Sequence, residues 1–158
     1  MNINSTSLTY ETWDEQTVQE VTRQLKDSIE VLKWGYEQYT DKIIYACSFG
    51  VEGIVLIDLI NKVQPNAKIV FLDTGLHFKE TYDLIEKVED RYPRLDIEQV
   101  KPAFTVAEQA RIYGDELWKR NPNLCCQMRK IEPLKQVLKG YKAWISGLRR
   151  EQSPARRH

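Results

Sequence analysis

Short apolar runs rich in β-branched residues alternate along this chain with longer segments of helical periodicity. The runs are KIIYACS (42–48), KIVFLDTG (68–75), LDIEQVKP (95–102) and YKAWISGL (141–148). Each has the length and composition of a strand. A parallel pair of strands needs a helical crossover between them, and the alternation supplies one each time. The sequence therefore predicts an α/β domain with a mainly parallel sheet.

Helices are expected in the segments 51–65, 78–93, 104–114 and 125–140, with a loop at 119–124. The first 40 residues also favour helices, because apolar side chains recur there at spacings of three and four, at Val18, Val21, Leu25, Ile29, Leu32 and Tyr36. No repeat and no linker rich in Gly, Ser or Pro divides the chain. We therefore expect one domain over residues 1–158, with N-terminal helices in 1–40 and an α/β core in 41–158.

The composition, 42% apolar and 29% charged residues, is that of a folded globular protein. The longest apolar run, GIVLIDLI, is far shorter than the roughly 20 residues that a membrane span needs. The N-terminus lacks the basic region and apolar core of a secretory signal, so a cytoplasmic location is expected. In that compartment three cysteines do not predict a disulfide framework.

The net charge of zero hides a strong asymmetry between the two parts of the chain. Residues 1–110 hold 11 Lys and Arg against 19 Asp and Glu, a net charge of −8, whereas residues 111–158 hold 12 against 4, a net charge of +8. Such a basic segment suits an anionic small molecule, a polyanion, or the acidic part of its own domain. The four interspersed acidic residues argue against nucleic acid.

Polar and glycine-rich segments follow three of the predicted strands: CSFGVEG, LDTGLHF and SGLRREQS. Ligands of open α/β sheets bind outside the carboxyl ends of the strands. Ser48 and Gly50 precede a helix, where free amides and the helix dipole favour an anion, although a tight turn with an N-cap serine would look the same. Asp73, Thr74 and Gly75 with His77 fit either a second wall of a site or a turn that caps the next helix.

The last strand is followed by Arg149, Arg150, Arg156 and Arg157. A guanidinium group donates two hydrogen bonds in a fork that suits phosphate and sulfate. The alternative is a solvated tail.

Cys125 and Cys126 are adjacent, and three interpretations compete. A disulfide between neighbours closes a strained ring, and buried structural thiols are a second possibility. The third is metal ligation, since Arg129 and Lys130 would lower the thiol pKa and offset the charge of a thiolate-bound cluster. A cubane cluster needs four cysteines, and Cys47 lacks a nearby partner in the sequence.

Taken in order, SFGVEG, LDTGLHFKET, CCQMRK and GLRREQSPAR resemble the assimilatory sulfonucleotide reductases, the adenylyl-sulfate and phosphoadenylyl-sulfate reductases of sulfate assimilation and cysteine biosynthesis. The resemblance extends from residue 48 to residue 156. It implies the adenine-nucleotide α-hydrolase-like (PP-loop) fold, which has a Rossmann-like sheet.

The resemblance also implies substrate-binding roles. The loop that holds the phosphosulfate end of the nucleotide would comprise Ser48, Phe49 and Gly50. The loop beside the adenosine would comprise Leu72, Asp73 and Gly75. The segment that lines the nucleotide site would comprise Gly147, Arg149, Arg156 and Arg157.

Cys125 and Cys126 match the adjacent pair that ligates a [4Fe-4S] cluster in this family, and Lys130 matches a lysine between cluster and substrate. Members with the pair are the iron–sulfur type, most of which act on adenylyl sulfate rather than 3′-phosphoadenylyl sulfate. The family's other two ligands, a Cys-x-x-Cys, and its nucleophile, in Glu-Cys-Gly-x-His, do not occur in these 158 residues. The expectation is a C-terminally truncated reductase.

The implied reaction is attack of that cysteine on the sulfate sulfur, which releases AMP, or adenosine 3′,5′-bisphosphate from the phosphorylated nucleotide. Thioredoxin then releases sulfite from the S-sulfocysteine. The chain alone is expected to be inactive. Two alternatives stay open: an ATP pyrophosphatase or nucleotidyl transferase on the same fold, such as the small subunit of ATP sulfurylase, and a non-catalytic nucleotide-binding protein. Phe49 and Glu52 depart from the Ser-Gly-Gly-x-Asp-Ser loop typical of the first alternative.

Overall fold

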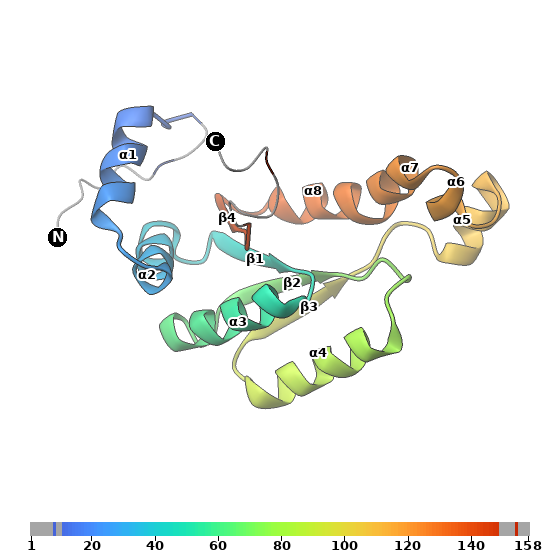
Figure 1. The fold of residues 1–158 in the computed structure, drawn as a ribbon, viewed down its shortest axis with the longest axis horizontal. Helices are drawn as coiled ribbons and strands as arrows, with labels where there is room; N and C mark the ends of the chain where they lie inside the picture. Colours follow the sequence, from blue (N-terminus) through green and yellow to red (C-terminus); the bar gives the residue numbers. More distant parts are fainter. Residues whose placement is uncertain (1–7, 9–10, 149–153, 155–158) are drawn as a thin grey trace.

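A parallel sheet forms the centre of the molecule. The computed structural model describes residue 8, residues 11–148 and residue 154. Within them the sheet has four strands in the order β3-β2-β1-β4, all parallel (Figure 1). The strands are β1 (Ile43–Cys47), β2 (Lys68–Leu72), β3 (Asp96–Val100) and β4 (Ala143–Ile145). The predicted α/β class and parallel sheet are confirmed.

The helices alternate with the strands, as the sequence periodicity predicts. Before the sheet come α1 (Glu15–Gln24) and α2 (Ser28–Tyr39). The crossovers from β1 to β2 and from β2 to β3 are α3 (Val51–Val63) and α4 (Lys79–Arg91). Between β3 and β4 the chain forms α5 (Val106–Tyr113), α6 (Leu117–Arg120), α7 (Pro122–Cys126), the π-helical segment η1 (Gln127–Ile131) and α8 (Glu132–Leu138).

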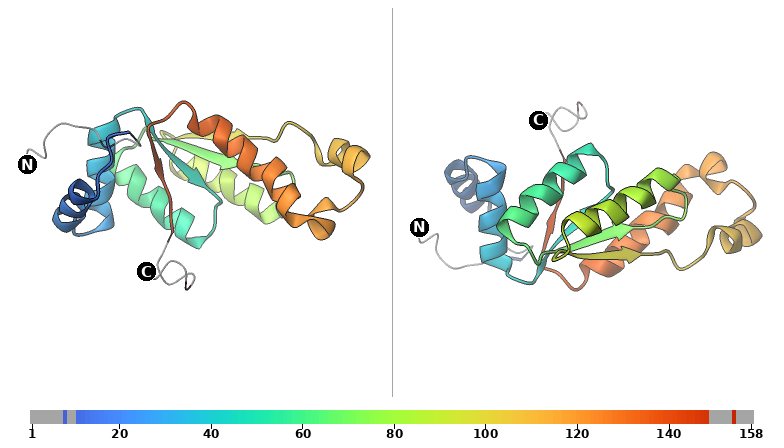
Figure 2. Two further views of the ribbon diagram at one scale, coloured as in Figure 1. Left: turned by 90° about the horizontal axis from the view of Figure 1, so that it is seen from above. Right: turned by 90° about the horizontal axis from the view of Figure 1, so that it is seen from below.

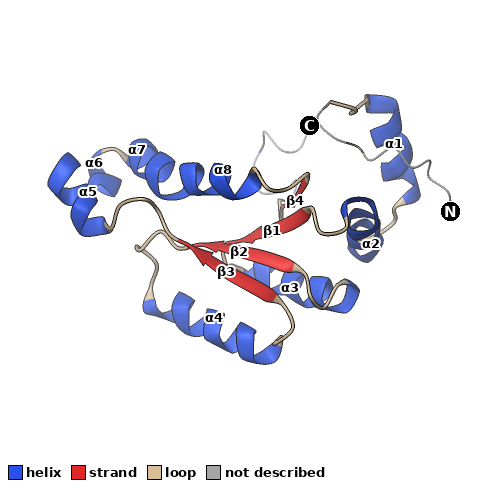
Figure 3. Ribbon diagram, turned by 180° about the vertical axis from the view of Figure 1, so that it is seen from behind, coloured by secondary structure: helices blue, strands red, loops and turns tan. Residues whose placement is uncertain are grey.

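The sheet separates two apolar layers of different size. Figures 2 and 3 show α3 and α4 along one face and α8 across the other. On the α3 and α4 side, Phe71 and Ile57 have no exposed surface and lie in the larger cluster, which α2 joins through Leu32 and Tyr36. On the α8 side, Ile44 and the fully buried Val70 pack against residues of α8 and the turn after it. Each fully buried side chain of this size contributes about 1.5–3 kcal/mol to folding.

The segment before the cysteine pair differs from the sequence-based expectation. Residues 119–124 were expected to form a loop, yet α6 and α7 occupy most of them. The Asn121 side chain accepts a hydrogen bond from the Leu124 amide (3.1 Å), and Pro122 occupies the first turn of α7. Asparagine and proline thus start a helix here, as an N-cap and an N1 residue do. The loop prediction is wrong because both residues are also loop signals.

None of the helices in the part of the chain that the structure describes is long and apolar enough to cross a membrane.

Candidate functional site

A cavity of about 400 Å³ lies where the strand order reverses. The chain runs from β1 outward to β2 and β3 and then returns to β4 on the other side of β1. This is the switch point at which open α/β sheets bind their ligands. The lining residues come from the ends of β1, β2 and β4, from the loops that follow them, and from α3, η1 and α8. They are Tyr45, Ala46, Cys47, Ser48, Glu52, Gly53, Leu72, Thr74, His77, Lys130, Ile131, Leu134, Trp144, Ser146, Gly147 and Leu148.

The turn between β1 and α3 forms one wall of this cavity. Phe49 has φ 56°, a left-handed conformation that is costly for a bulky residue. Its buried ring packs edge-to-face on Phe71, with the centroids 5.3 Å apart, and this packing holds the turn. Ser48 is exposed and lines the cavity, while Gly50 is the N-cap of α3 and has no side chain to cap it. The first-turn amides of α3 therefore have no acceptor from the N-cap residue.

Cys47 lies beneath the same turn. Its sulfur accepts a hydrogen bond from the Phe49 amide (3.2 Å), and a Cβ atom on Gly53 would come within 3.0 Å of it. Burial raises the pKa of the Cys47 thiol, and the hydrogen bond from Phe49 only partly opposes this effect. Cys47 is thus kept as a neutral thiol in the cavity wall.

The loop after β2 forms the opposite wall and is shaped by Asp73. This carboxylate is 7% exposed, and its Oδ1 accepts hydrogen bonds from the Gly75 amide (2.9 Å) and the Tyr82 hydroxyl (2.7 Å). The hydrogen bond to Asp73 raises the pKa of Tyr82 to about 12. Gly75 has φ 73°, which suits glycine. Beside this loop His77 lines the cavity, with its ring against Phe71 (centroids 4.9 Å apart).

The cysteine pair lies at the junction of α7 and η1. Cys125 is 5% exposed, whereas Cys126 is exposed, and both thiols are free. The disulfide interpretation is therefore wrong. The side-chain amide of Gln109 donates a hydrogen bond to the Cys125 sulfur at 3.8 Å. Among the described residues, no three His, Cys, Asp or Glu side chains are grouped so that they could hold a metal ion.

Arg129 connects the cysteine pair with the wall of the cavity. The guanidinium is 3% exposed and donates to the carbonyl oxygens of Thr74 and Phe104 (3.0 Å for Phe104) and to Gln109 Oε1 (3.1 Å). Burial lowers the pKa of Arg129, while the nearby Cys125 and Asp73 oppose that shift. All three hydrogen-bond acceptors are uncharged. A buried cation next to Cys125 suits a thiolate in that position.

The structure brings together part of the residue set expected from the sequence. Ser48, Leu72, Lys130 and Gly147 line the same cavity. The side chains of Phe49 and Asp73 point into the protein, and Gly50 and Gly75 belong to the turns that form the cavity walls. Arg149, Arg156 and Arg157 lie outside the described residues.

Sequence reasoning did not select Gln109 or Trp144, and it named Thr74 only as part of the loop after the second strand. Trp144 is part of the cavity lining, Thr74 accepts from Arg129, and Gln109 joins Arg129 to Cys125. A polar residue within an amphipathic helix gives no signal of burial, so Gln109 could not be found from the pattern. Trp144 could have been found, because it immediately precedes a strand end that was already selected.

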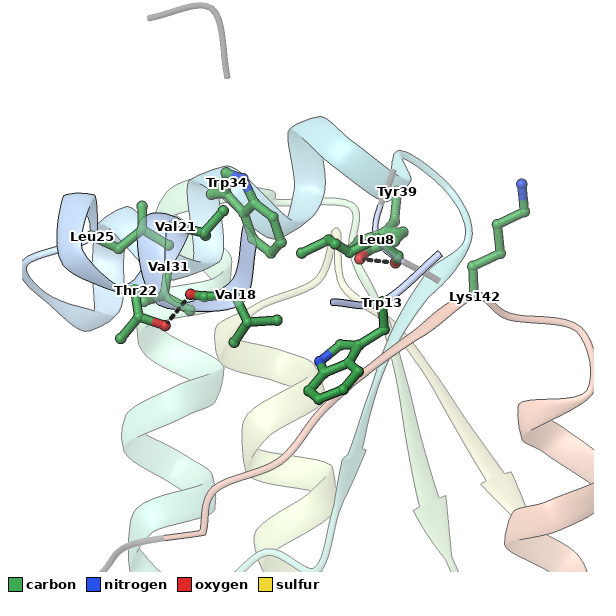
Figure 4. A pocket seen from close by; sticks show the side chains of 10 residues that line it. All are labelled: Leu8, Trp13, Val18, Val21, Thr22, Leu25, Val31, Trp34, Tyr39 and Lys142. Carbon is green, nitrogen blue, oxygen red and sulfur yellow. Dashed lines mark hydrogen bonds between the residues drawn. The ribbon is translucent and has the colours of Figure 1, made fainter. Parts of the chain in front are cut away.

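A larger hollow of about 970 Å³ lies among the N-terminal helices, and its lining is mainly apolar (Figure 4). Its walls include Trp13 before α1, Val18 and Val21 of α1, and Trp34 of α2. The hydroxyl of Tyr39 donates to the Leu8 carbonyl at its edge. This hollow is not lined by the carboxyl ends of the strands, where the polar loops lie. The smaller cavity at the switch point is therefore the candidate site.

The comparisons with known proteins identify a family. The sequence model of the phosphoadenosine phosphosulfate reductase domain matches residues 42–158. The chain is 59% identical over 152 residues to adenosine 5′-phosphosulfate reductase 2 of Bacillus subtilis (strain 168), with 96% of this chain and 64% of the relative covered. It is also 59% identical over 155 residues to adenosine 5′-phosphosulfate reductase of Geobacillus thermodenitrificans (strain NG80-2), with 96% and 65% covered. The chain thus spans just under two thirds of the length of these relatives.

A solved structure supports the same fold. The crystal structure of phosphoadenylyl-sulfate reductase from Candida auris, a phosphate complex, matches with a TM-score of 0.76 and 31% sequence identity. The match covers 89% of this chain and 70% of that one. A structural match of this extent confirms the expected fold, including the parallel sheet with its switch point.

Proposed function

The chain belongs to the phosphoadenosine phosphosulfate reductase domain family, and on this basis we propose that it is the nucleotide-binding part of a reductase that converts adenylyl sulfate to sulfite and AMP. Adenylyl sulfate is the adenosine 5′-phosphosulfate in the names of the bacterial relatives. The observation that carries the proposal is the cavity at the strand switch point, with Ser48 and Lys130 on its walls. In the intact protein, thioredoxin would be the reductant, and 3′-phosphoadenylyl sulfate would be a second substrate. The protein would act in the cytoplasm.

The anionic end of the nucleotide would lie against the N-terminus of α3. Ser48 offers a hydroxyl there, and the amides of the first turn of α3 have no capping side chain from Gly50. The N-terminus of a helix, with its backbone amides and its dipole, binds phosphate and sulfate well. Lys130 lines the cavity from the η1 side and would add a positive charge. The three arginines Arg149, Arg156 and Arg157 would extend this basic environment.

The nucleoside would contact the apolar part of the cavity. Leu72, Leu134 and Trp144 line it together with Ile131. Binding pockets commonly combine an apolar wall with a few polar groups that fix the orientation of the ligand. The indole of Trp144 is half exposed, so its face is available to a planar base.

The cysteine pair fits one half of the ligand set of a [4Fe-4S] cluster. Cys125 is buried next to a hydrogen-bond donor and the buried Arg129, which suits a thiolate ligand, and Cys126 is exposed beside it. When bound, the cluster would supply a charged, polarisable group near the sulfate end of the substrate. The role of Cys125 and Cys126 would be to hold it, and that of Lys130 to neutralise charge between it and the substrate. The remaining ligands and the nucleophile would come from the rest of the intact protein.

Calorimetric titration of the purified chain with AMP, adenylyl sulfate and ATP tests the nucleotide site. We expect Ser48→Ala and Lys130→Ala each to weaken the binding of adenylyl sulfate about ten-fold, since each removes a group that contacts an anion. Ser28→Ala and Lys135→Ala are matched controls on α2 and α8 and should bind as the parent chain does. Lys135 forms an exposed ion pair with Glu132 (3.6 Å) and is not part of the cavity lining.

Two results would contradict the proposal. The first is binding that is unchanged in the Ser48 and Lys130 variants. The second is release of pyrophosphate from ATP by the chain, which would favour a nucleotidyl transferase or pyrophosphatase on the same fold.

A further inference from the structure

Gln109 is a polar side chain with almost no access to solvent. It is 2% exposed, and it lies on α5, a helix of eight residues. Its partners are far away in the sequence: Arg129 lies 20 residues and Cys125 lies 16 residues along the chain. A buried amide must form its hydrogen bonds within the protein, because desolvation without partners costs about 1–3 kcal/mol.

The orientation of the Gln109 amide follows from the chemistry of its neighbours. A guanidinium has five N–H donors and no acceptor, so the group that faces Arg129 Nη1 at 3.1 Å must be the amide oxygen. The NH₂ group then faces the other way, toward Cys125 Sγ at 3.8 Å. Arg129 thus fixes the direction in which Gln109 presents its donor.

Arg129 is itself held in place by the loop that follows β2. Its Nε donates to the Thr74 carbonyl, and its Nη1 donates to the Phe104 carbonyl (3.0 Å) as well as to Gln109. These contacts form a continuous path from a residue of the cavity wall, Thr74, through Arg129 and Gln109 to the sulfur of Cys125.

We infer that Gln109 is a positioning residue for the cysteine pair: its amide N–H group supports the sulfur of Cys125, and its amide oxygen holds Arg129 beside that sulfur. The inference rests on the proposed cluster site and adds to it a residue from a separate helix. A hydrogen bond to a ligand sulfur stabilises the more negative, reduced state of a cluster and so raises its reduction potential. Cys125 accepts this hydrogen bond, whereas Cys126 is exposed, so the two proposed ligands differ in their surroundings.

Two substitutions separate the two parts of this role. Gln109→Glu keeps an oxygen for Arg129 but has no donor for Cys125, whereas Gln109→Leu removes both groups at similar volume. Gln136→Glu is the matched control, because Gln136 is exposed on α8 and accepts a hydrogen bond from the neighbouring Lys139 Nζ (3.1 Å).

The first measurement is the midpoint potential of the cluster in a longer chain that includes the family's Cys-x-x-Cys, after anaerobic reconstitution with iron and sulfide. We expect both Gln109 variants to shift to a lower potential and Gln136→Glu to match the parent chain. Because the carboxylate of Gln109→Glu lowers the potential through its charge alone, the neutral variant Gln109→Leu decides whether the amide group itself matters. An unchanged potential in Gln109→Leu would overturn the inference.

The second measurement does not need a cluster. In the metal-free chain, the side-chain NH₂ protons of Gln109 should move upfield in the NMR spectrum of Cys125→Ala, because the sulfur acceptor is lost. Cys126→Ala should leave them in place. Absence of a shift in Cys125→Ala would refute the inference even if no cluster formed. Failure of the longer chain with the Cys-x-x-Cys to take up a cluster would count against the proposed cluster site alone, and the NMR shift would still decide the role of Gln109.

Discussion

The carboxylate of Asp73 lies below the loop after β2, where it accepts hydrogen bonds from the Gly75 amide and the Tyr82 hydroxyl. At the residue scale, these two hydrogen bonds explain why a carboxylate can follow a strand directly in a site that is proposed to bind an anion. Its charge is turned away from the cavity lining and is used to fix the loop. The place of Asp73 in the sequence was informative, but the direction of its side chain depended on Tyr82, nine residues away.

The first prediction concerns the tyrosines that stay neutral in the folded protein. Hydrogen bonding to Asp73 raises the pKa of Tyr82 to about 12, and burial raises the pKa of Tyr36 to about 12, from an ordinary value of 10.0. Both folded-state values lie above the unfolded value. The stabilisation is therefore complete below pH 10 and is lost as the pH rises from 10 toward 12.

Urea unfolding at pH 8, 10 and 11.5 tests this prediction. We expect the free energy of unfolding to decrease between the last two values, and to decrease less in Tyr82→Phe, which has no proton to lose there. An equal decrease in the parent and the variant would show that Tyr82 does not contribute.

At the scale of elements, α5 is defined by its first turn. Thr105 Oγ1 accepts from the Glu108 amide (3.1 Å), and Glu108 accepts from the Thr105 amide (2.8 Å), so the two form a capping box. The hydrogen bond from the Thr105 amide is the main reason that the pKa of Glu108 is lowered. Since α5 carries Gln109, this box also fixes the helix that reaches the cysteine pair.

We predict that Thr105→Ala lowers the free energy of unfolding by about 1 kcal/mol, the usual cost of removing an N-cap. Chemical denaturation measures this change in the free energy of unfolding, with the same m-value for the parent chain and the variant. Thr22→Ala serves as the control, because the Thr22 hydroxyl donates to the Val18 carbonyl within its own helix (2.7 Å) and caps no helix end. A change for Thr105→Ala no larger than that for Thr22→Ala would contradict the prediction.

The elements show how far sequence periodicity extends. The strands and most helices were predictable, because burial on a sheet face and on one side of a helix imposes a local repeat. The short helices before the cysteine pair were missed, since Asn121 and Pro122 signal a helix start as readily as a loop. The burial of Gln109 and Arg129 was also beyond reach, because it depends on contacts between α5, η1 and the loop after β2.

At the scale of the whole molecule, the chain carries the proposed nucleotide site and half of the proposed cluster site, but not the nucleophile motif that the family resemblance implies. We predict that the purified 158 residues release no sulfite from adenylyl sulfate with reduced thioredoxin. Cys47 is buried, and burial raises the pKa of its thiol, so it is a poor nucleophile. Sulfite above the level of the enzyme-free control would overturn this prediction, and a longer chain that includes Glu-Cys-Gly-x-His serves as the positive control.

The parallel sheet was predictable from the alternation of strands and helices, whereas its strand order, and with it the switch point, was not. The single-domain organisation over residues 1–158 stays a prediction. The cavity itself needed the structure, because its walls come from four segments that are brought together only by the strand order β3-β2-β1-β4.

The π-helical segment η1 lies between the cysteine pair and α8. A π-helical turn contains one residue more than an α-helical turn. The side chains of the helix before it are therefore shifted by one residue position relative to those of the helix after it. Each residue of an α-helix corresponds to a rotation of about 100°. Deletion of one residue from η1 would therefore redirect both sulfur atoms by that angle, while the contact of α8 with the sheet stays in register.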